Sequence, residues 1–405
     1  MHAGTEPLDS SRGDDRVLHI IYSMKQGGAE RLVLDAAIAQ SRSDGQGGRF
    51  PAIVVCWNHE GALAGKLKDA GIPVTCLDRR LRPIWKVPFF LMDLRRLVRD
   101  IRALAHEHRV RILHGHLVDG IVLAALTARA TGLPSVGTVY SNHIIPFGIK
   151  RGSLKYKAWH RATRWGLNRV DHVVTVSKEA TQSLIEQFGV PANRASERPV
   201  VVTPVPKSHS RAEARAIFGV SEQTLCLVFV GRLVANKNQA DLVRAVALLK
   251  ERGLSVRLLL TGEGPDAERL SELSEQLGVG DDVSLLGLYD DLPAVLHAAD
   301  MFVSASISEG VSLALLEAMS AGVPIVSTPA EGNAELLQNG VGTLSKAKSA
   351  ASLADAVADL WADKNAMHEQ AQRAHSFYEE GYSGAKALES DNRIYDLVLE
   401  RGAGT

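Results

Sequence analysis

Short apolar runs alternate with amphipathic helical stretches along most of the chain. The first run, residues 16–22, is followed by a glycine-rich turn and by a helix that we expect over 29–39. Parallel strands that are covered by helices on both faces give such continuous apolar runs. The same alternation predicts further strands in the first half of the chain over 51–56, 73–77, 112–114, 135–139 and 172–176.

A second series of the same kind begins near Pro199. It includes a helix expected over 239–252, and a polar, helical tail follows from 352 to 401. Two consecutive βα series of similar size predict an α/β fold with two doubly wound, Rossmann-like domains. The strands of this second series are expected over 225–230, 256–260, 283–286, 301–303 and 324–327.

Prolines mark the boundary between the two series, because Pro199, Pro204 and Pro206 cluster there. The first residues are polar and lack the apolar segment of a signal peptide, which favours a disordered extension. The expected domains are an extension (1–15), an N-terminal domain (16–200), a C-terminal domain (201–375) and a helical tail (376–405), with a return of the tail onto the N-terminal domain as an option.

Composition narrows the class of protein. The chain has 405 residues, 45% of them hydrophobic, and a formal net charge of zero, which argues against a nucleic-acid binder. Its three cysteines lie in apolar runs without metal-ligand spacing, which is typical of reduced thiols in a cytoplasmic protein. No apolar run reaches the roughly 18–20 residues of a membrane span.

Two acids after a strand of the second series are the first candidates for chemistry. Open α/β sheets bind ligands at the carboxyl ends of their strands, so two such domains predict a site in the cleft between them. Glu309 and Glu317 follow the strand at 301–303, and eight helical steps would separate them by about 12 Å. One acid could bind sugar hydroxyls and the other ribose hydroxyls, with the free N–H groups of Gly310, Val311, Ser312 and Leu313 suited to a diphosphate. Taken alone, the spacing fits a helix-start acid and a solvated acid equally well.

Cations occur after the preceding strands. Gly231 and Arg232 follow the strand at 225–230, and Lys237 comes soon after. Arg offers a planar fork and Lys a point charge, so the two could neutralise a leaving diphosphate without a metal. Gly262 begins a Gly-Glu-Gly turn after the next strand, where the backbone could approach a ligand closely. Solvated loop cations and an ordinary turn remain the alternative.

Together these motifs resemble the GT-B glycosyltransferases of family 4, a large family of retaining enzymes. The resemblance covers roughly residues 16–345 and is strongest over 226–330. Its motifs are two glutamates eight residues apart, a Gly-Arg-Leu…Lys segment, a Gly-x-Gly turn and a glycine-rich N-terminal loop. In this sequence they are Glu309 and Glu317, Gly231 to Lys237, Gly262 to Gly264, and Gly27 to Glu30.

The resemblance implies a role for each donor-side residue. Arg232 and Lys237 would bind the diphosphate, Glu309 would lie near the transferred sugar, and Glu317 would bind the ribose. Gly287 and Leu288 would line the base pocket. Such enzymes need no metal or cofactor, and no Asp-x-Asp motif follows a strand here. Catalysis would rest on Glu309, Arg232, Lys237 and His116.

The N-terminal side is where this sequence departs from the family. Gly27 and Gly28 would face the donor phosphates, or they form only a flexible turn. His116 matches the position of a family histidine, although a lone histidine at a strand end is often structural. Many members carry another histidine near the sugar, where this chain has Tyr140; His143 lies three residues further on. Either Tyr140 replaces that group on the acceptor side, or the loop differs.

The expected reaction is transfer of a sugar from a nucleotide diphosphate to a glycan or lipid-linked acceptor, as in polysaccharide biosynthesis. On family frequency UDP is the first expectation for the nucleotide and GDP the second. Residues 150–169 hold seven Lys or Arg and no acid, and 79–111 are also basic, with aromatic residues in both. Such stretches suit peripheral contact with the cytoplasmic membrane face, or they are amphipathic surface helices.

Two other functions remain open for this sequence. One is a catalytically silent subunit that binds a nucleotide sugar, which the departure at Tyr140 allows. The other is a sugar-nucleotide epimerase of the same fold, although that class lacks the pairing of a Gly-Arg-Leu…Lys segment with the two glutamates. Release of nucleotide diphosphate would separate a transferase from both.

Overall fold

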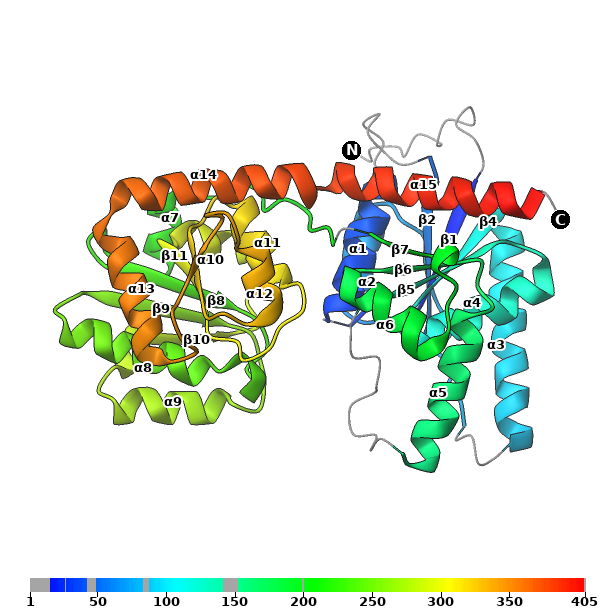
Figure 1. Ribbon diagram of the computed structural model, residues 1–405, viewed down its shortest axis with the longest axis horizontal. Coiled ribbons are helices and arrows are strands. Elements are labelled where there is room, and N and C mark those ends of the chain that lie inside the picture. Colours follow the sequence, from blue (N-terminus) through cyan, green and yellow to red (C-terminus); the bar gives the residue numbers. More distant parts are fainter. Residues whose placement is uncertain are drawn as a thin grey trace, which may run out of the picture. The chain divides into compact units, whose positions relative to one another are not determined.

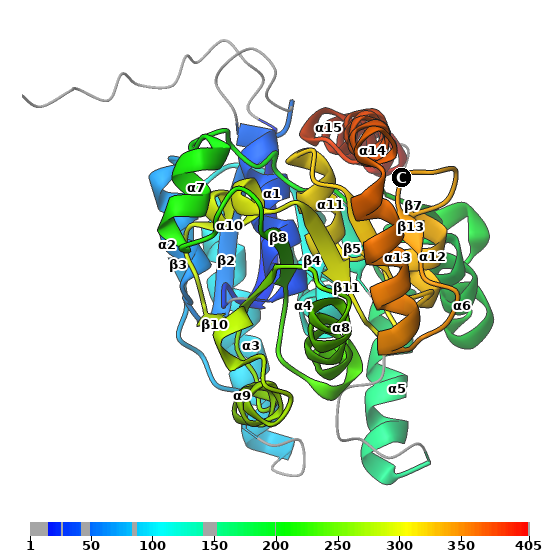
Figure 2. The ribbon, with the colours of Figure 1, turned by 90° about the vertical axis from the view of Figure 1, so that its left-hand side faces the viewer.

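The computed structural model describes residues 15–403 apart from 26, 42–48, 83–86, 141–151 and 199. These residues form two compact units, one built from residues 1–201 and 384–405 and the other from 202–383. We call them unit 1 and unit 2. In each unit helices cover both faces of a sheet (Figures 1 and 2).

Unit 1 contains a seven-stranded sheet in its described part, in the order β3-β2-β1-β4-β5-β6-β7, and all neighbouring strands pair in parallel. The strands are β1 (Arg16–Ser23), β2 (Ala52–His59), β3 (Val74–Cys76), β4 (Val110–His116), β5 (Ser135–Val139), β6 (His172–Thr175) and β7 (Ala195–Glu197). The helices are α1 (Gly28–Ser41), α2 (Leu63–Asp69), α3 (Val87–Glu107), α4 (Leu117–Thr131), α5 (Leu154–Leu167), α6 (Lys178–Phe188), η1 (Ala192–Arg194) and α15 (Gly384–Ala403).

Unit 2 contains a six-stranded parallel sheet in the order β10-β9-β8-β11-β12-β13. Its strands are β8 (Leu225–Val230), β9 (Val256–Thr261), β10 (Val283–Gly287), β11 (Met301–Ser304), β12 (Ile325–Ser327) and β13 (Thr343–Leu344). Its helices are α7 (Arg211–Ile217), η2 (Ala235–Lys237), α8 (Gln239–Glu251), α9 (Ala267–Gln276), η3 (Gly280–Asp282), α10 (Leu292–Ala298), α11 (Leu313–Ser320), α12 (Glu331–Leu336), α13 (Ala350–Ala362) and α14 (Lys364–Gly381).

The continuous apolar runs arise because each sheet has two buried faces. In β1, Leu18 and Ile20 pack in a core cluster with Leu97 of α3, whereas Ile21 packs with Val33 of α1 in a different cluster. Successive side chains of a strand point to opposite faces, so a doubly covered strand needs an apolar residue at nearly every position. The prediction of two doubly wound domains is thus confirmed, and each expected strand is present, whereas β7 and β13 were not predicted.

The domain limits differ from those expected at the end of the chain. The expected boundary at 375 falls inside α14, and unit 2 extends to Ser383. Helix α15 belongs to unit 1, where Ile394, Tyr395 and Val398 are buried in a cluster with Val17 and Phe50. The last helix is therefore part of the core of unit 1. The expected extension lies outside the described residues except for Asp15.

Candidate active site

The carboxyl edge of the unit 2 sheet is built from two turns that lie backbone against backbone. Gly231 follows β8 with φ 152°, and Gly262 follows β9 with φ 135°. A Cβ on Gly262 would overlap the carbonyl oxygen of Gly231, and a Cβ on Gly264 would overlap that of Leu233. The Leu233 amide donates to the Glu263 carbonyl at 2.8 Å. This close approach requires glycine, which explains why the two motifs occur together.

Lys237 and Glu309 form an ion pair at this edge. The side-chain Nδ2 of Asn236 donates to the Ser308 carbonyl at 2.7 Å, and the backbone amide of Ile307 donates to the Asn236 carbonyl at 2.9 Å, so hydrogen bonds connect the two loops. The Glu309 side chain is 11% exposed. Its second oxygen, Oε2, is buried and accepts no hydrogen bond from the described residues. An unsatisfied buried oxygen costs about 1–3 kcal/mol, which a hydroxyl donor from a ligand would offset.

Arg232 places a second cation on the same turn as Gly231, and its side chain is exposed. Its carbonyl accepts a hydrogen bond from Gln239 Nε2 at 2.8 Å, which fixes the turn. Gly287 ends β10 with φ 62°, and its carbonyl accepts from the Gly262 amide at 2.7 Å. Leu288, the next residue, is 53% exposed. The predicted residues 231, 232, 237, 262, 287, 288 and 309 thus all lie at strand ends or loops of one sheet edge.

The segment after Glu309 corrects one expectation. Helix α11 begins at Leu313 with Ser312 at its N-cap position, so Gly310, Val311 and Ser312 are not helical. The eight-step helical geometry therefore does not relate Glu309 to Glu317, because a loop separates the first acid from the helix that carries the second. The alternative of a solvated Glu317 is also wrong, because this residue is 7% exposed within α11.

The sequence did not predict several residues that hold the loops at this edge of the sheet in place. Gly332 packs directly on the Glu309 loop, because a Cβ there would overlap the Gly310 carbonyl oxygen. The Gly332 amide also donates to the Glu309 carbonyl at 3.1 Å. Asn236 and Gln239 anchor the loops, as described above. The sequence signal was Gly332 itself, because glycine is a poor helix former and is used where two backbones approach closely.

In unit 1 the β1–α1 turn contains Gly27, and α1 begins at Gly28. A Cβ on Gly27 would overlap the Glu30 carboxylate, so the turn needs glycine to accommodate that side chain. Burial raises the pKa of Glu30, and the nearby Asp119 carboxylate adds to the shift. Gly27 therefore has a local role, which is to leave room for the Glu30 side chain.

His116 and Tyr140 meet at the carboxyl edge of the unit 1 sheet. His116 is the last residue of β4 and is buried, and Tyr140 directly follows β5. His116 Nδ1 and the Tyr140 hydroxyl oxygen are 2.7 Å apart. Burial raises the pKa of Tyr140 well above its usual value. His143 lies outside the described residues.

A buried polar cluster behind His116 was not anticipated. His19 of β1 and His114 of β4 stack near His116, with His19 Nδ1 2.8 Å from His116 Nε2. Burial lowers the pKa of His19 to about 4 and lowers the pKa of His114 and His116 well below the usual value. The sequence signal was the presence of histidine inside apolar strands, where a neutral imidazole needs partners.

Models of known families match both halves of the chain. The model for glycosyltransferase family 4 matches residues 26–202, and that for glycosyl transferases group 1 matches residues 210–377. The chain belongs to the group 1 glycosyltransferases. It is therefore a transferase of GT-B fold, which confirms the predictions of family, fold and enzyme class.

The names of individual relatives of this glycosyltransferase mention different nucleotides, sugars and acceptors. It is 32% identical over 280 residues to a GDP-mannose-dependent alpha-(1-6)-phosphatidylinositol monomannoside mannosyltransferase of Mycobacterium tuberculosis, covering 65% of this chain and 70% of the relative. It is 24% identical to an N-acetyl-alpha-D-glucosaminyl L-malate synthase of Bacillus anthracis, covering 75% and 79%. The crystal structure of Anabaena Alr3699/HepE in complex with UDP matches with a TM-score of 0.76 at 22% identity, covering 95% and 100%.

One group of this glycosyltransferase's described residues has the spacing of a metal site. The ligand atoms of His19, His114 and His116 lie within 4.8 Å of one another. However, the nitrogens of His19 and His116 that face each other are already joined by a hydrogen bond. His114 Nδ1 lies 2.7 Å from the Tyr395 hydroxyl and His114 Nε2 2.7 Å from Thr138 Oγ1. The cluster thus satisfies its own polar atoms.

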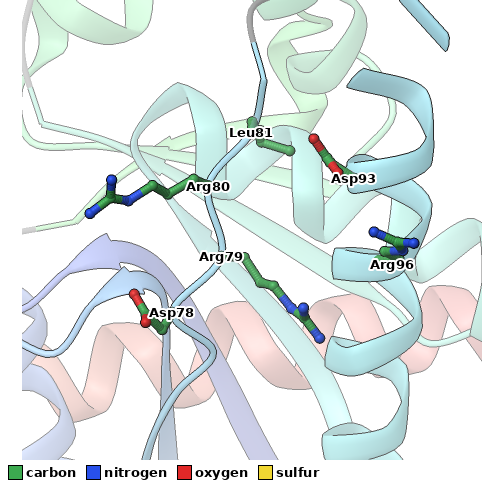
Figure 3. Close-up of a pocket in the computed structure, with 6 residues that line it drawn as sticks. All are labelled: Asp78, Arg79, Arg80, Leu81, Asp93 and Arg96. Atoms are coloured by element: carbon green, nitrogen blue, oxygen red, sulfur yellow. The ribbon is translucent and has the colours of Figure 1, made fainter. Parts of the chain in front are cut away.

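A surface pocket of about 360 Å³ lies in unit 1 between the loop after β3 and helix α3 (Figure 3). Two of its charged lining residues form ion pairs, because Arg79 contacts Asp100 and Asp93 contacts Arg82. The hydrogen bonds from Arg82 lower the pKa of Asp93 to about 2. The pocket is lined by Asp78, Arg79, Arg80, Leu81, Asp93 and Arg96. The basic stretch from residue 79 is therefore partly neutralised by its own aspartates.

Proposed function

We propose that this glycosyltransferase moves a sugar, with retention of configuration and without a metal, from a nucleotide diphosphate to a glycan or lipid-linked acceptor. The supporting observation is the pair Lys237–Glu309, in which the second Glu309 oxygen is buried and has no hydrogen-bond donor among the described residues. A sugar hydroxyl would donate to this oxygen. Polysaccharide or glycoconjugate biosynthesis is the expected setting.

In this proposal charge and position carry the catalysis. Lys237 and the exposed Arg232 would neutralise the departing diphosphate, and the carboxylate of Glu309 would hold the sugar. Fixed charges at the place where charge develops need no reorganisation during the reaction. Because the two cations supply the neutralisation, turnover should persist in excess chelator. Loss of turnover in EDTA that added Mg²⁺ or Mn²⁺ restores would contradict the metal-independent mechanism.

The donor nucleotide is the first unknown to test. One similar solved structure contains UDP, and one similar enzyme is named as dependent on GDP-mannose. We propose a UDP-sugar first and a GDP-sugar second. A thermal-shift panel of UDP, GDP and ADP tests this choice, because a ligand at about 100 times its Kd stabilises the folded state by about 2.7 kcal/mol. A shift with ADP alone would contradict both assignments.

Turnover tests the proposal as a whole. Wild-type protein should release nucleotide diphosphate from the matching donor sugar, slowly to water and faster with an acceptor extract. The product's anomeric configuration, measured by NMR, should equal that of the donor. An inverted product would rule out retention. Binding without any release would favour a silent subunit.

The structures of α5 and α3 limit which of the two basic stretches could contact a membrane surface. Trp159 and Trp165 of α5 pack against the core of unit 1 and are not free to enter a lipid surface. Phe89 and Leu91 of α3 are 49% and 45% exposed, with the Arg82 guanidinium 4.6 Å from the centre of the Phe89 ring. We therefore place the proposed peripheral contact at the start of α3. Among the described residues no helix is long and apolar enough to span a bilayer.

Vesicle flotation tests this surface. Full-length protein should float with vesicles that contain anionic lipid, and Phe89→Ser with Leu91→Ser should weaken that binding. Trp159→Phe in α5 is the matched control and should float like the wild type. Equal flotation of all variants, or none with any vesicle, would contradict a contact through α3.

A further inference from the structure

A continuous line of hydrogen bonds, buried except for the partly buried last one at Tyr140, runs from α15 to Tyr140 inside unit 1. Asp391 of α15 forms a buried ion pair with Arg198. Gln40 Nε2 of α1 donates a hydrogen bond to Asp391 Oδ2 at 2.9 Å. Gln40 Oε1 lies 2.9 Å from His19 Nε2. His19 Nδ1 lies 2.8 Å from His116 Nε2, and His116 Nδ1 lies 2.7 Å from the Tyr140 hydroxyl.

Chemistry fixes the direction of each hydrogen bond in this line. The carboxylate of Asp391, paired with Arg198, only accepts, so the amide nitrogen of Gln40 must face it. Gln40 Oε1 therefore faces His19 and accepts from Nε2–H. A neutral imidazole carries one N–H, which leaves His19 Nδ1 bare and able to accept from His116 Nε2–H. Burial keeps the pKa of both imidazoles low, which favours the neutral forms.

The last hydrogen bond follows from the others. His116, with its hydrogen on Nε2, has a bare Nδ1, so the Tyr140 hydroxyl must donate to it. All hydrogens in the line therefore point inward, from Tyr140 towards Asp391. The Tyr140 oxygen then offers only a lone pair to whatever lies outside.

We propose that Asp391, Gln40 and His19 are positioning residues that commit the Tyr140 hydroxyl hydrogen to His116, so that Tyr140 binds a sugar hydroxyl of the acceptor only as a hydrogen-bond acceptor. This inference rests on the proposed function. It assigns a role to the tyrosine that stands where many family members carry a histidine. It also gives α15 a part in the reaction, because Asp391 fixes the direction of all the hydrogen bonds between itself and Tyr140.

A branch of the same cluster supplies a matched control. Gln40 Nε2 also donates to the Tyr395 hydroxyl at 3.3 Å, and that oxygen lies 2.7 Å from His114 Nδ1. This branch ends at Thr138 and does not reach Tyr140. Tyr395→Phe therefore removes a buried hydroxyl beside Gln40 but leaves the line to Tyr140 intact.

Ring-nitrogen NMR of protein labelled with ¹⁵N-histidine tests the direction of the line without any substrate. At neutral pH, His19 and His116 should both be neutral with the hydrogen on Nε2, assigned through His19→Gln and His116→Gln. Asp391→Asn keeps the shape but can turn its amide to Gln40, so both tautomers of His116 should appear. A hydrogen on Nδ1 of wild-type His116, or a doubly protonated ring, would overturn the proposal.

Kinetics with the matching donor and acceptor test the consequence. Tyr140→Phe and Gln40→Met should each lower kcat about tenfold, the value of one lost hydrogen bond, with the donor KM unchanged. Tyr395→Phe should stay within about twofold of wild type, since its lost hydroxyl is off the line. If Gln40→Met behaves like Tyr395→Phe while Tyr140→Phe is impaired, the proposal fails. If the wild type shows no turnover, the proposed function fails, and the tautomers still decide the direction of the line.

Discussion

The carboxyl edges of the two sheets differ in how they handle charge. In unit 2 the edge holds an ion pair between Lys237 and Glu309 and an exposed Arg232 beside them. In unit 1 the corresponding edge holds His116 and Tyr140, which burial keeps neutral. A diphosphate carries charge, and an acceptor hydroxyl does not. Under the proposed function, the unit 2 edge would bind the donor through charge, and the unit 1 edge would bind the acceptor through the direction of hydrogen bonds.

The largest effect is expected from breaking the buried ion pair between Asp391 and Arg198 behind the unit 1 edge. Asp391→Ala leaves the buried Arg198 without its partner, which should cost about 3–5 kcal/mol of unfolding free energy. Urea unfolding combined with pulse hydrogen exchange should show the loss in unit 1 peptides while unit 2 peptides keep their stability. An equal loss in both units would mean that the pair does not act locally.

Removal of the Lys237 charge at the unit 2 edge should lower the catalytic rate more than it lowers the unfolding free energy. Lys237→Ala should lower kcat by about 10²–10³-fold, as for other preorganised groups that stabilise a developing charge. Lys250→Ala, which breaks an exposed pair with Asp282 in the same unit, is the control and should leave kcat unchanged. Similar rates for both variants would remove Lys237 from the donor site.

Acid should distinguish the two units. The pKa of His19 is about 4 in the folded chain and about 6.5 when unfolded, so the unfolded state binds more protons between these values. The stability that His19 contributes is present above pH 6.5 and is lost as the pH falls to 4, at most about 3 kcal/mol. None of the described histidines of unit 2 is buried. Urea midpoints of unit 1 peptides should therefore fall more steeply with acid, and parallel curves for the two units would contradict this difference.

The smallest effect is expected at an exposed ion pair. Arg252 and Asp355 of unit 2 are 40% and 62% exposed, so Arg252→Ala should change the unfolding free energy by no more than about 1 kcal/mol. The measurement is the urea midpoint at low and high salt. A larger change would show that exposed charges stabilise unit 2 away from the carboxyl edge of its sheet.

Much of the fold and of the carboxyl edge of the unit 2 sheet could be predicted from the sequence because both depend on local patterns. Doubly covered strands require apolar runs, and the turns at Gly231 and Gly262 require glycine beside each other. The loop between Glu309 and α11 could not be predicted, because helix periodicity does not show where the first turn begins. The line of hydrogen bonds from α15 to Tyr140 could not be predicted either. Gln40 and Asp391 are 351 positions apart, and their contact depends on where α15 packs.

The placement of α15 has a consequence for how the chain folds during synthesis. Unit 2 is one continuous segment, whereas unit 1 is completed by a helix that is synthesised after all of unit 2. Until α15 emerges, the guanidinium of Arg198 and the amide of Gln40 have no carboxylate to bind. We therefore expect unit 2 to fold before unit 1 is complete, and the docking of α15 to order the hydrogen bonds behind Tyr140 as the last step.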